Sequence, residues 1–437
     1  MSCYVTPIKV LVAGCSYGGI AAVVNLLDLC AARPARGAPD KVPHEVASRG
    51  VPVEIHVVDE RDGYLHLIGC PLAFASNEHA PKMWVKFGDI PALQDSRVRW
   101  TQGSLMKVDP ETKVANVKIA KSGEVFEESY DFFLAATGLQ RNYPVVPQKL
   151  SRDQYLLETA DHVDSIKAAD TGIVVIGGGA VGIEMAAELK VAEPSTKVTL
   201  IQSRDKLLSA EPLPDAFREV ALSALTDIDV EVILGRGRVI ATETIPAENG
   251  KTMQRLTFPD GSHIDAAHVI NAVSTQIPTT SYLPPSTLND EGLVIINNLL
   301  RFGDSPRHYA VGDIAAWSGI KRCGAAIHMG YLAAEGMHQQ MMHELHAIEP
   351  NFTIWPEVVP MIALAIGKKA ATYSPDGGVA CSEELMRLFF SDDLGFSGCW
   401  NHMKLSEPPA SEAVGKYSVL PQSAPYREMR GSNAIAA

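Results

Sequence analysis

This chain of 437 residues contains two copies of one local pattern, in which an apolar strand leads through a glycine-rich turn into a helix of small residues. The turn residues are Gly14, Ser16, Gly18 and Gly19 in "VAGCSYGG" and Gly177, Gly179 and Gly182 in "IGGGAVG". Such a turn lets the backbone approach a pyrophosphate at the N-terminus of the following helix. Because one turn holds one dinucleotide, the two copies predict two dinucleotide-binding domains in an α/β fold. A duplicated fold with one inactive turn is the alternative.

The first turn departs from the usual glycine pattern at its middle position. Ser16 stands there, and serine is the smallest non-glycine residue with a hydroxyl donor. The acid that holds ribose hydroxyls at the end of the second strand is Asp59. Asp59 lies farther along the chain than the usual spacing of about 20 residues, and the excess coincides with the Pro/Gly/Arg-rich residues 31–52. We expect this stretch to be a surface insertion, and Cys15, beside a bound diphosphate, to be unreactive.

Composition and charge exclude several classes of partner. A net charge of −13 without any Lys/Arg block opposes binding to nucleic acid, so small molecules are the expected partners. No apolar run approaches the ~18 residues that a membrane span needs. The first strand begins too close to Met1 to leave room for a targeting segment, so we expect a cytoplasmic protein.

The seven cysteines are scattered, with no CxxC or CxxxxC spacing. This pattern argues against a disulfide framework, a thiolate zinc site and a dithiol redox centre. We therefore expect reduced thiols and no metal site.

Two further segments resemble motifs of flavoproteins that bind two dinucleotides. "YDFFLAATGLQR", which contains Thr137 and Gly138, is similar to the segment that closes the FAD domain, and "RHYAVGDIAAW", which contains Asp313, is similar to the late FAD motif. With both glycine turns, these motifs occur in the order typical of FAD/NAD(P)H-dependent pyridine nucleotide oxidoreductases. Within that group the chain most resembles fungal relatives of apoptosis-inducing factor and of the ferroptosis-suppressor NAD(P)H:quinone oxidoreductases.

The resemblance implies a role for several residues near the flavin. Asp313 would hydrogen-bond the ribityl or pyrophosphate part of FAD, and the next helix, with His328 in its first turn, would point its N-terminus at the flavin. The positive end of that helix would stabilise the reduced flavin anion. Hydride would pass from NAD(P)H to flavin N5, with Glu184 beside the contact between the two rings; an ordinary exposed helix residue is the alternative for Glu184.

The choice between the two nicotinamide coenzymes depends on the end of the second strand in the second unit. Gln202 and Ser203 stand there instead of an acid that would repel the 2′-phosphate, and Arg204 follows as a candidate phosphate partner. NADPH is therefore favoured, while the neighbouring Asp205 leaves use of NADH open.

The sequence leaves three alternatives for the acceptor half of the reaction. The resemblance implies a quinone or a similar small two-electron acceptor. Cys70 follows Asp59 at a distance similar to that of the redox thiol in single-cysteine flavoprotein peroxide and disulfide reductases, which makes it a candidate catalytic residue. The third alternative is a redox-sensing flavoprotein without rapid turnover.

These expectations divide the chain into three parts. An FAD-binding domain comprises residues 1–150 and 277–350, because Asp313 completes the site that Gly14 begins, and an NAD(P)H-binding domain comprises residues 151–276. Residues 351–437 form a C-terminal α+β lobe. Within residues 382–396, an apolar helix face for core packing or a homodimer contact is expected from Leu385, Met386, Leu388, Phe389 and Phe390. The segment from Gln422 onward is expected to be a loose tail, and "NAVSTQIP" predicts an altered return from the NAD(P)H-binding domain.

Overall fold

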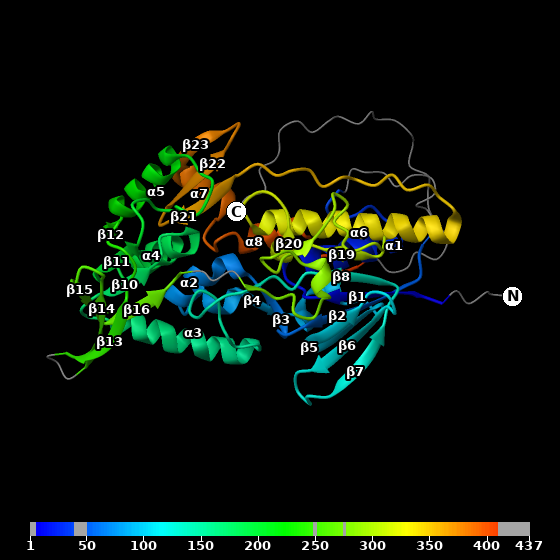
Figure 1. Ribbon diagram of the computed structural model, residues 1–437, viewed down its shortest axis with the longest axis horizontal. Coiled ribbons are helices and arrows are strands. Elements are labelled where there is room, and N and C mark those ends of the chain that lie inside the picture. The colour runs from blue at the N-terminus through cyan, green and yellow to red at the C-terminus, as the bar shows by residue number, and fades with distance from the viewer. Residues whose placement is uncertain (1–5, 39–49, 248–250, 274–276, 410–437) are drawn as a thin grey trace.

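The computed structural model describes residues 6–38, 50–247, 251–273 and 277–409 (Figure 1). Its largest sheet has seven strands in the order β19-β8-β1-β2-β5-β6-β7. The five strands from β19 to β5 pair in parallel, and β6 and β7 continue the sheet as an antiparallel meander. The strands are β1 (Ile8–Ala13), β2 (Val53–Asp59), β5 (Val98–Asp109), β6 (Val114–Ile119), β7 (Val125–Ser129), β8 (Phe132–Ala135) and β19 (His308–Ala310).

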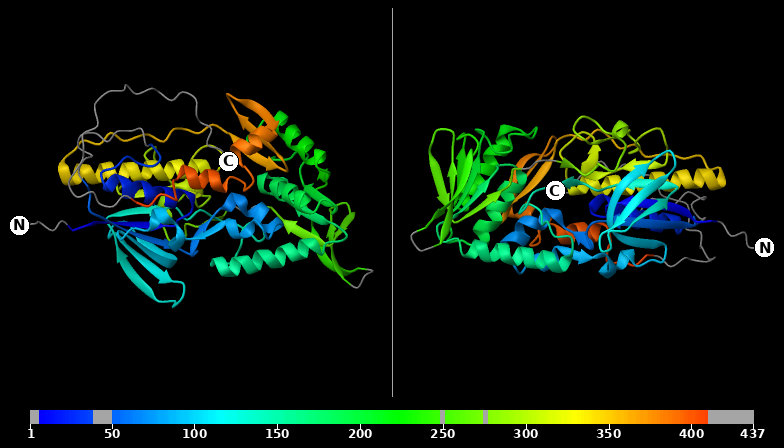
Figure 2. Two further views of the ribbon diagram at one scale, coloured as in Figure 1. Left: turned by 180° about the vertical axis from the view of Figure 1, so that it is seen from behind. Right: turned by 60° about the horizontal axis from the view of Figure 1, so that its bottom comes forward.

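Helices α1 (Tyr17–Cys30) and α6 (Cys323–His346) lie together over one face of this sheet (Figures 1 and 2). Small residues allow them to approach closely, since a Cβ added at Gly330 would lie 2.2 Å from the Gly18 carbonyl oxygen. Nearly every residue of α1 is buried between the sheet and α6. The N-terminus of α1 is therefore fixed at the carboxyl end of β1, which is where parallel sheets bind their ligands.

A second, four-stranded parallel sheet has the order β12-β11-β10-β16. Helices α4 (Ala180–Ala192) and α5 (Asp215–Asp227) pack against it, and an antiparallel three-stranded sheet lies beside it. The strands are β10 (Ile173–Ile176), β11 (Val198–Gln202), β12 (Val230–Leu234), β16 (His268–Asn271), β13 (Ala241–Pro246), β14 (Thr252–Thr257) and β15 (His263–Ala266). Two parallel sheets, each with a glycine turn after its first strand, confirm the predicted α/β class.

The chain passes from the first sheet to the second and later returns to the first. These two connecting segments lie side by side. β9 (Leu139–Gln140) pairs antiparallel with β17 (Ile277–Pro278), so the outgoing and returning chain form a short ribbon. The outgoing chain then enters α3 (Arg152–Lys167), whose first turn is capped by the Ser151 hydroxyl oxygen, which accepts from the backbone N–H of Gln154. Residues 274–276 of the altered return segment lie outside the described residues.

The C-terminal lobe contains the antiparallel strands β21 (Ile362–Ile366), β22 (Lys369–Ser374) and β23 (Gly378–Ser382). Leu364, Ile366 and Ala371 share a core with the second sheet and its helices. Helix α7 (Glu383–Phe389) contains four of the five residues expected to make an apolar helix face, and Phe390 follows it directly. A separate helix, α8 (Phe396–His402), begins at the end of this stretch.

The break between α7 and α8 has a local cause. Ser391, Leu394 and Gly395 all adopt positive φ values, which end the helical path. Phe390 and Leu394 are buried against α7 and the strands β21 and β22, so tertiary packing stabilises the turn. The predicted tail from Gln422 onward lies outside the described residues.

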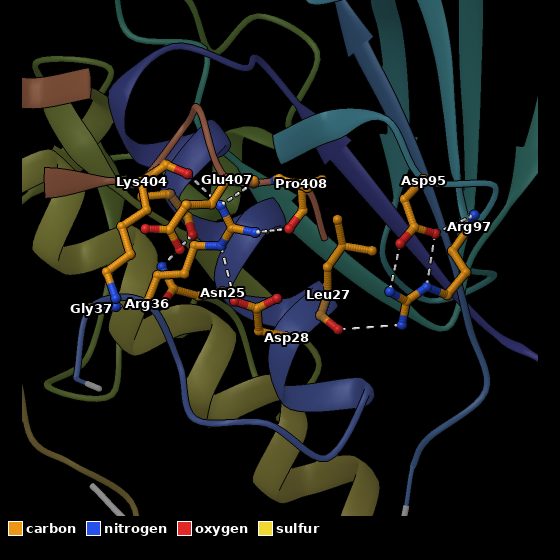
Figure 3. A network of polar contacts seen from close by, with 11 residues as sticks. Asn25, Leu27, Asp28, Arg36, Gly37, Asp95, Arg97, Lys404, Glu407 and Pro408 are labelled. Carbon is orange, nitrogen blue, oxygen red and sulfur yellow. Dashed lines mark hydrogen bonds and ion pairs between the residues drawn. The ribbon is translucent and has the colours of Figure 1, made fainter. Parts of the chain in front are cut away.

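The expected surface insertion, residues 31–52, is partly exposed and partly packed against the protein in its described part. Arg36 is only 6% exposed and its Nε forms an ion pair with Asp28 Oδ2 at 2.9 Å. Figure 3 shows its Nη1 donating to the carbonyl oxygens of Lys404, at 2.6 Å, and Glu407, at 3.0 Å. Sequence reasoning missed this contact because its partners lie at the other end of the chain.

Several short elements complete the structure. Helix α2 (Cys70–Ala75) packs against α3 and α4, and it thereby joins the first unit to the second. None of the helices in the described ranges combines the length and apolar character needed to cross a bilayer. The remaining strands are β3 (Gly63–Leu65), β4 (Trp84–Lys86), β18 (Val294–Ile295) and β20 (Ala315–Ala316).

Candidate functional site

One large cavity of about 1900 Å³ lies between the two sheets and the C-terminal lobe. Pockets for a single small molecule usually measure roughly 300–1,000 Å³, so this cavity has room for two cofactors. Most of the residues predicted from the sequence border it. They are Gly14, Ser16, Gly18, Asp59, Thr137, Gly138, Asp313, Gly177, Gly179, Glu184 and Arg204.

The first glycine turn is shaped by close approaches of its backbone. Gly14 adopts φ +85°, and a Cβ at Gly19 would lie 2.0 Å from the Gly14 carbonyl oxygen. Gly19 does not border the cavity; it lets α1 begin directly against β1. The turn thus directs the backbone N–H groups at the start of α1 toward the cavity, where an anion would satisfy them.

Two polar atoms beside this turn are suited to a bound dinucleotide. Ser16 Oγ and Arg61 Nε are buried without a hydrogen-bond partner in the described part of the chain, and both residues border the cavity. Buried polar atoms of this kind normally have partners. A phosphate or ribose would supply acceptors for both, so the residues present fit such a group. Sequence reasoning missed Arg61, which directly follows the "VVDE" strand end.

Asp59 is held against the first turn by backbone hydrogen bonds. Its Oδ2 accepts from Cys15 N at 2.6 Å and its Oδ1 accepts from Arg61 N at 2.8 Å. Burial raises the pKa of Asp59. Burial and the nearby Asp59 raise the pKa of the Cys15 thiol, which does not border the cavity.

The late motif places Asp313 at the opposite edge of the same turn. Arg141 Nη2 donates to Asp313 Oδ2 at 3.4 Å, and both residues border the cavity. Lys321, just before α6, also borders it and donates to the carbonyl oxygen of Ala315. Burial lowers the pKa of Lys321, while Asp313 opposes that shift. Sequence reasoning missed both Arg141 and Lys321. For Lys321 a signal was visible, namely the basic pair in "IKRCGAA" just before the helix.

The second glycine turn repeats the geometry of the first. A Cβ at Gly182 would lie 1.8 Å from the Gly177 carbonyl oxygen, whereas Gly179 faces open space and borders the cavity. Gly182 itself lies behind the cavity wall and allows α4 to pack against β10.

The end of β11 lies beside this second turn. Gln202 Oε1 accepts from Gly178 N at 3.3 Å, and the exposed Arg204 donates to the Ser209 carbonyl oxygen at 3.4 Å. Asp205 does not border the cavity, but Glu211, which the sequence did not single out, does.

Glu184 lies in the second turn of α4, with part of its side chain on the cavity. Its Oε1 accepts from Ala365 N in β21 at 3.2 Å. Burial raises the pKa of Glu184 to about 8, although the hydrogen bond from Ala365 acts in the opposite direction. The alternative of an ordinary exposed helix residue is therefore wrong.

The structure contradicts the expected position of His328. Helix α6 begins at Cys323, so its first turn contains Cys323 and Ala326, which border the cavity. His328 lies in the second turn, is exposed and does not border the cavity. Its ring lies 5.4 Å from the ring of Trp355, between centroids. The expected helix begins at Gly324, one residue from the observed start, so the error concerns the face of α6 on which His328 lies and not the position of the helix.

Cys70 lies at the first position of α2 and is fully buried. It packs in the core shared by Phe74, Trp84 and Tyr155, and it does not border the cavity. Burial raises the pKa of the Cys70 thiol to about 12. Redox thiols need the opposite environment, with partial exposure and a lowered pKa, so the geometry opposes the thiol hypothesis.

Comparison with known proteins agrees with this arrangement. Residues 44–330 match the family described as pyridine nucleotide-disulphide oxidoreductase. The chain belongs to this family. Its members are FAD-dependent NAD(P)H oxidoreductases, so FAD and either NADPH or NADH are the cofactors of this protein.

Individual relatives extend the likeness over most of the chain. This chain is 48% identical over 413 residues to Oxidoreductase OXR1 of Ajellomyces capsulatus, and the match covers 92% of this chain and 89% of that protein. It is 25% identical to Ferroptosis suppressor protein 1 of Mus musculus, over 92% of this chain and 97% of that protein. The fold is similar to that of the water-forming NADH oxidase of Lactobacillus brevis bound to NADH, with a TM-score of 0.60, 17% identity and coverage of 84% and 75%.

Proposed function

We propose that this oxidoreductase of the pyridine nucleotide-disulphide family passes electrons from NAD(P)H, through FAD, to a quinone-like or similar small two-electron acceptor. The observation that carries the proposal is the single cavity bordered by both glycine turns, because one shared space lets two ring systems meet. The C-terminal lobe adds the apolar residues Ile362, Leu364 and Phe390 to its wall. Such a wall suits a flat, weakly polar acceptor.

The first turn and the late motif are the proposed FAD site. Gly14, Ser16 and Gly18 would receive the pyrophosphate at the start of α1, and Asp59 would hold the ribose. Asp313 would contact the opposite part of the cofactor. Thr137 and Gly138 border the same region, where the Thr137 hydroxyl donates to the Thr279 carbonyl oxygen at 2.8 Å and so fixes this wall.

The second turn is the proposed NAD(P)H site. Gly177 and Gly179 border the cavity at the start of α4, and Arg204 lies at the end of β11, where a 2′-phosphate is normally recognised. We retain the division into an FAD-binding domain (residues 1–150 and 277–350), an NAD(P)H-binding domain (151–276) and a C-terminal lobe (351–437). A cytoplasmic location and a homodimer stay predictions.

When bound, FAD supplies two-electron transfer between NAD(P)H and the acceptor. The chain binds and orients the reactants and excludes water. The Glu184 carboxyl holds its proton up to a pH of about 8, and Ala365 N–H fixes its orientation, so its other oxygen can donate to an amide in the cavity. The N-terminus of α6, with Lys321 beside it, stabilises negative charge at its end of the cavity.

Stopped-flow absorbance near 450 nm tests the proposed function. We expect NADPH to bleach the flavin rapidly under anaerobic conditions and a soluble quinone to restore the colour rapidly. The Cys70→Ser variant is the matched control, and its rates should equal those of the wild type because Cys70 is buried away from the cavity.

Two outcomes would contradict the proposal. Turnover with peroxide or a disulfide that disappears in Cys70→Ser would favour a thiol reductase. Reduction by NADPH followed by slow reoxidation with every acceptor would favour a redox-sensing flavoprotein.

Arg204 gives a separate prediction about coenzyme preference. In Arg204→Ala, the KM for NADPH should rise about tenfold, which corresponds to about 1.4 kcal/mol for one lost charge-assisted contact. The KM for NADH should change less than twofold because NADH has no 2′-phosphate. Steady-state kinetics with both coenzymes checks this, and an equal rise for both would show that Arg204 does not recognise the phosphate.

A further inference from the structure

Two cysteines that are far apart in the sequence lie close together beside the cavity. The Sγ atoms of Cys323, the first residue of α6, and Cys399, in α8, are 3.9 Å apart. Figure 1 shows α8 next to the start of α6. The cysteines are scattered along the sequence, but folding brings these two together although no short motif connects them.

The two thiols face different environments. Cys323 is 5% exposed and borders the cavity, whereas Cys399 is partly exposed. The hydrogen bond with Cys399, together with burial, raises the pKa of the Cys323 thiol. The pair therefore joins a residue on the cavity wall to a residue that is partly exposed to solvent.

Aromatic packing holds α8 in this position. The Phe396 and Trp400 rings stack with centroids 5.5 Å apart, and Tyr64 lies 6.3 Å from Phe396 and 6.5 Å from Trp400. The turn before α8 is fixed by His66, whose Nε2 lies 2.9 Å from the Leu394 carbonyl oxygen. A disulfide has an S–S distance of about 2.05 Å, so the two sulfur atoms must move closer together for a bond to form.

We propose that Cys323 and Cys399 form a reversible redox pair, which a hydroperoxide from solvent oxidises to a disulfide that ties α8 to the start of α6. The Cys399 thiolate attacks the O–O bond, which breaks to give a sulfenic acid and, from hydrogen peroxide, one water molecule. The Cys323 sulfur then displaces the second oxygen as water. Two thiols lose two electrons and two protons in total, and two equivalents of a small thiol reverse the reaction by exchange.

Thiol counting on the full-length, FAD-loaded protein tests the proposal. After treatment with hydrogen peroxide and removal of the excess, the number of thiols titrated in denaturant should fall from seven to five. Non-reducing peptide mapping by mass spectrometry should show the Cys323–Cys399 linkage, and glutathione should restore seven thiols. A linkage between other cysteines, or no loss of thiols, would overturn the proposal without any variant.

Matched variants separate this pair from the other thiols. Cys399→Ser should start with six thiols and keep six after peroxide, whereas Cys381→Ser, which changes a partly exposed cysteine of the same lobe, should fall from six to four. A loss of two thiols in Cys399→Ser would contradict the proposal. Because the disulfide would close a long loop, oxidation should raise the Tm of the wild type by roughly 2–5 °C and leave the Tm of Cys399→Ser unchanged. An unchanged wild-type Tm in the presence of the mapped linkage would refute the part of the proposal that ties α8 to α6.

Discussion

Replacing Gly19 with alanine is expected to give a nearly colourless protein. The new Cβ would lie 2.0 Å from the Gly14 carbonyl oxygen, so either the turn or the start of α1 must move. Overpacking of this kind costs about 1–3 kcal/mol, which would weaken FAD binding about 5- to 150-fold. Absorbance at 450 nm relative to 280 nm, measured after gel filtration, reports the amount of retained flavin.

Gly88→Ala is the matched control for this experiment. Gly88 has no heavy atom within 4 Å of an added Cβ and does not border the cavity. This variant should keep the flavin content of the wild type. A yellow Gly19→Ala protein with normal flavin content would contradict the placement of FAD at the first turn.

The Gly182→Ala variant should show the complementary defect: it retains FAD, but NADPH reduces the flavin at least about 100-fold more slowly. The added Cβ would lie 1.8 Å from the Gly177 carbonyl oxygen and would displace the second turn or α4. A misplacement of about 1 Å in a reaction that depends on ring contact can cost about 100-fold in rate. Anaerobic stopped-flow reduction, with dithionite as a reductant that does not use the coenzyme site, separates the two steps.

The pair of glycine variants distinguishes the two sites from a duplicated fold with one inactive turn. If Gly182→Ala is reduced by NADPH as rapidly as the wild type, the second turn does not bind the coenzyme. If it loses FAD as completely as Gly19→Ala, the two turns do not act separately.

The features that sequence reasoning predicted well are local. The glycine turns follow β1 and β10 as expected because the strand, the turn and the helix start all lie within about a dozen neighbouring residues. Asp59 was also identified despite the unusual spacing, since the end of an apolar strand is visible in the sequence. These elements bring most of the predicted residues to one cavity.

The features that it missed depend on long-range packing. The exposed position of His328 depends on which face of α6 packs against α1, and no local pattern fixes that face. The buried setting of Glu184 depends on β21, a strand of the distant C-terminal lobe. The contact between Cys323 and Cys399, like that of Arg36 with residues near 404, joins segments whose proximity no local pattern encodes.

The ribbon of β9 and β17 limits how the two nucleotide-binding units can move. Both covalent crossings lie on this one narrow line, and Thr279 Oγ1 strengthens it by donating to the Gly138 carbonyl oxygen at 2.8 Å. Helix α2 joins the units at a second place, because it packs against α3 and α4 and shares a core with the second sheet. The C-terminal lobe adds a third connection, since β21 contacts one unit and α8 contacts the other. Any change in the relative position of the two coenzyme sites would therefore require all three connections to move together.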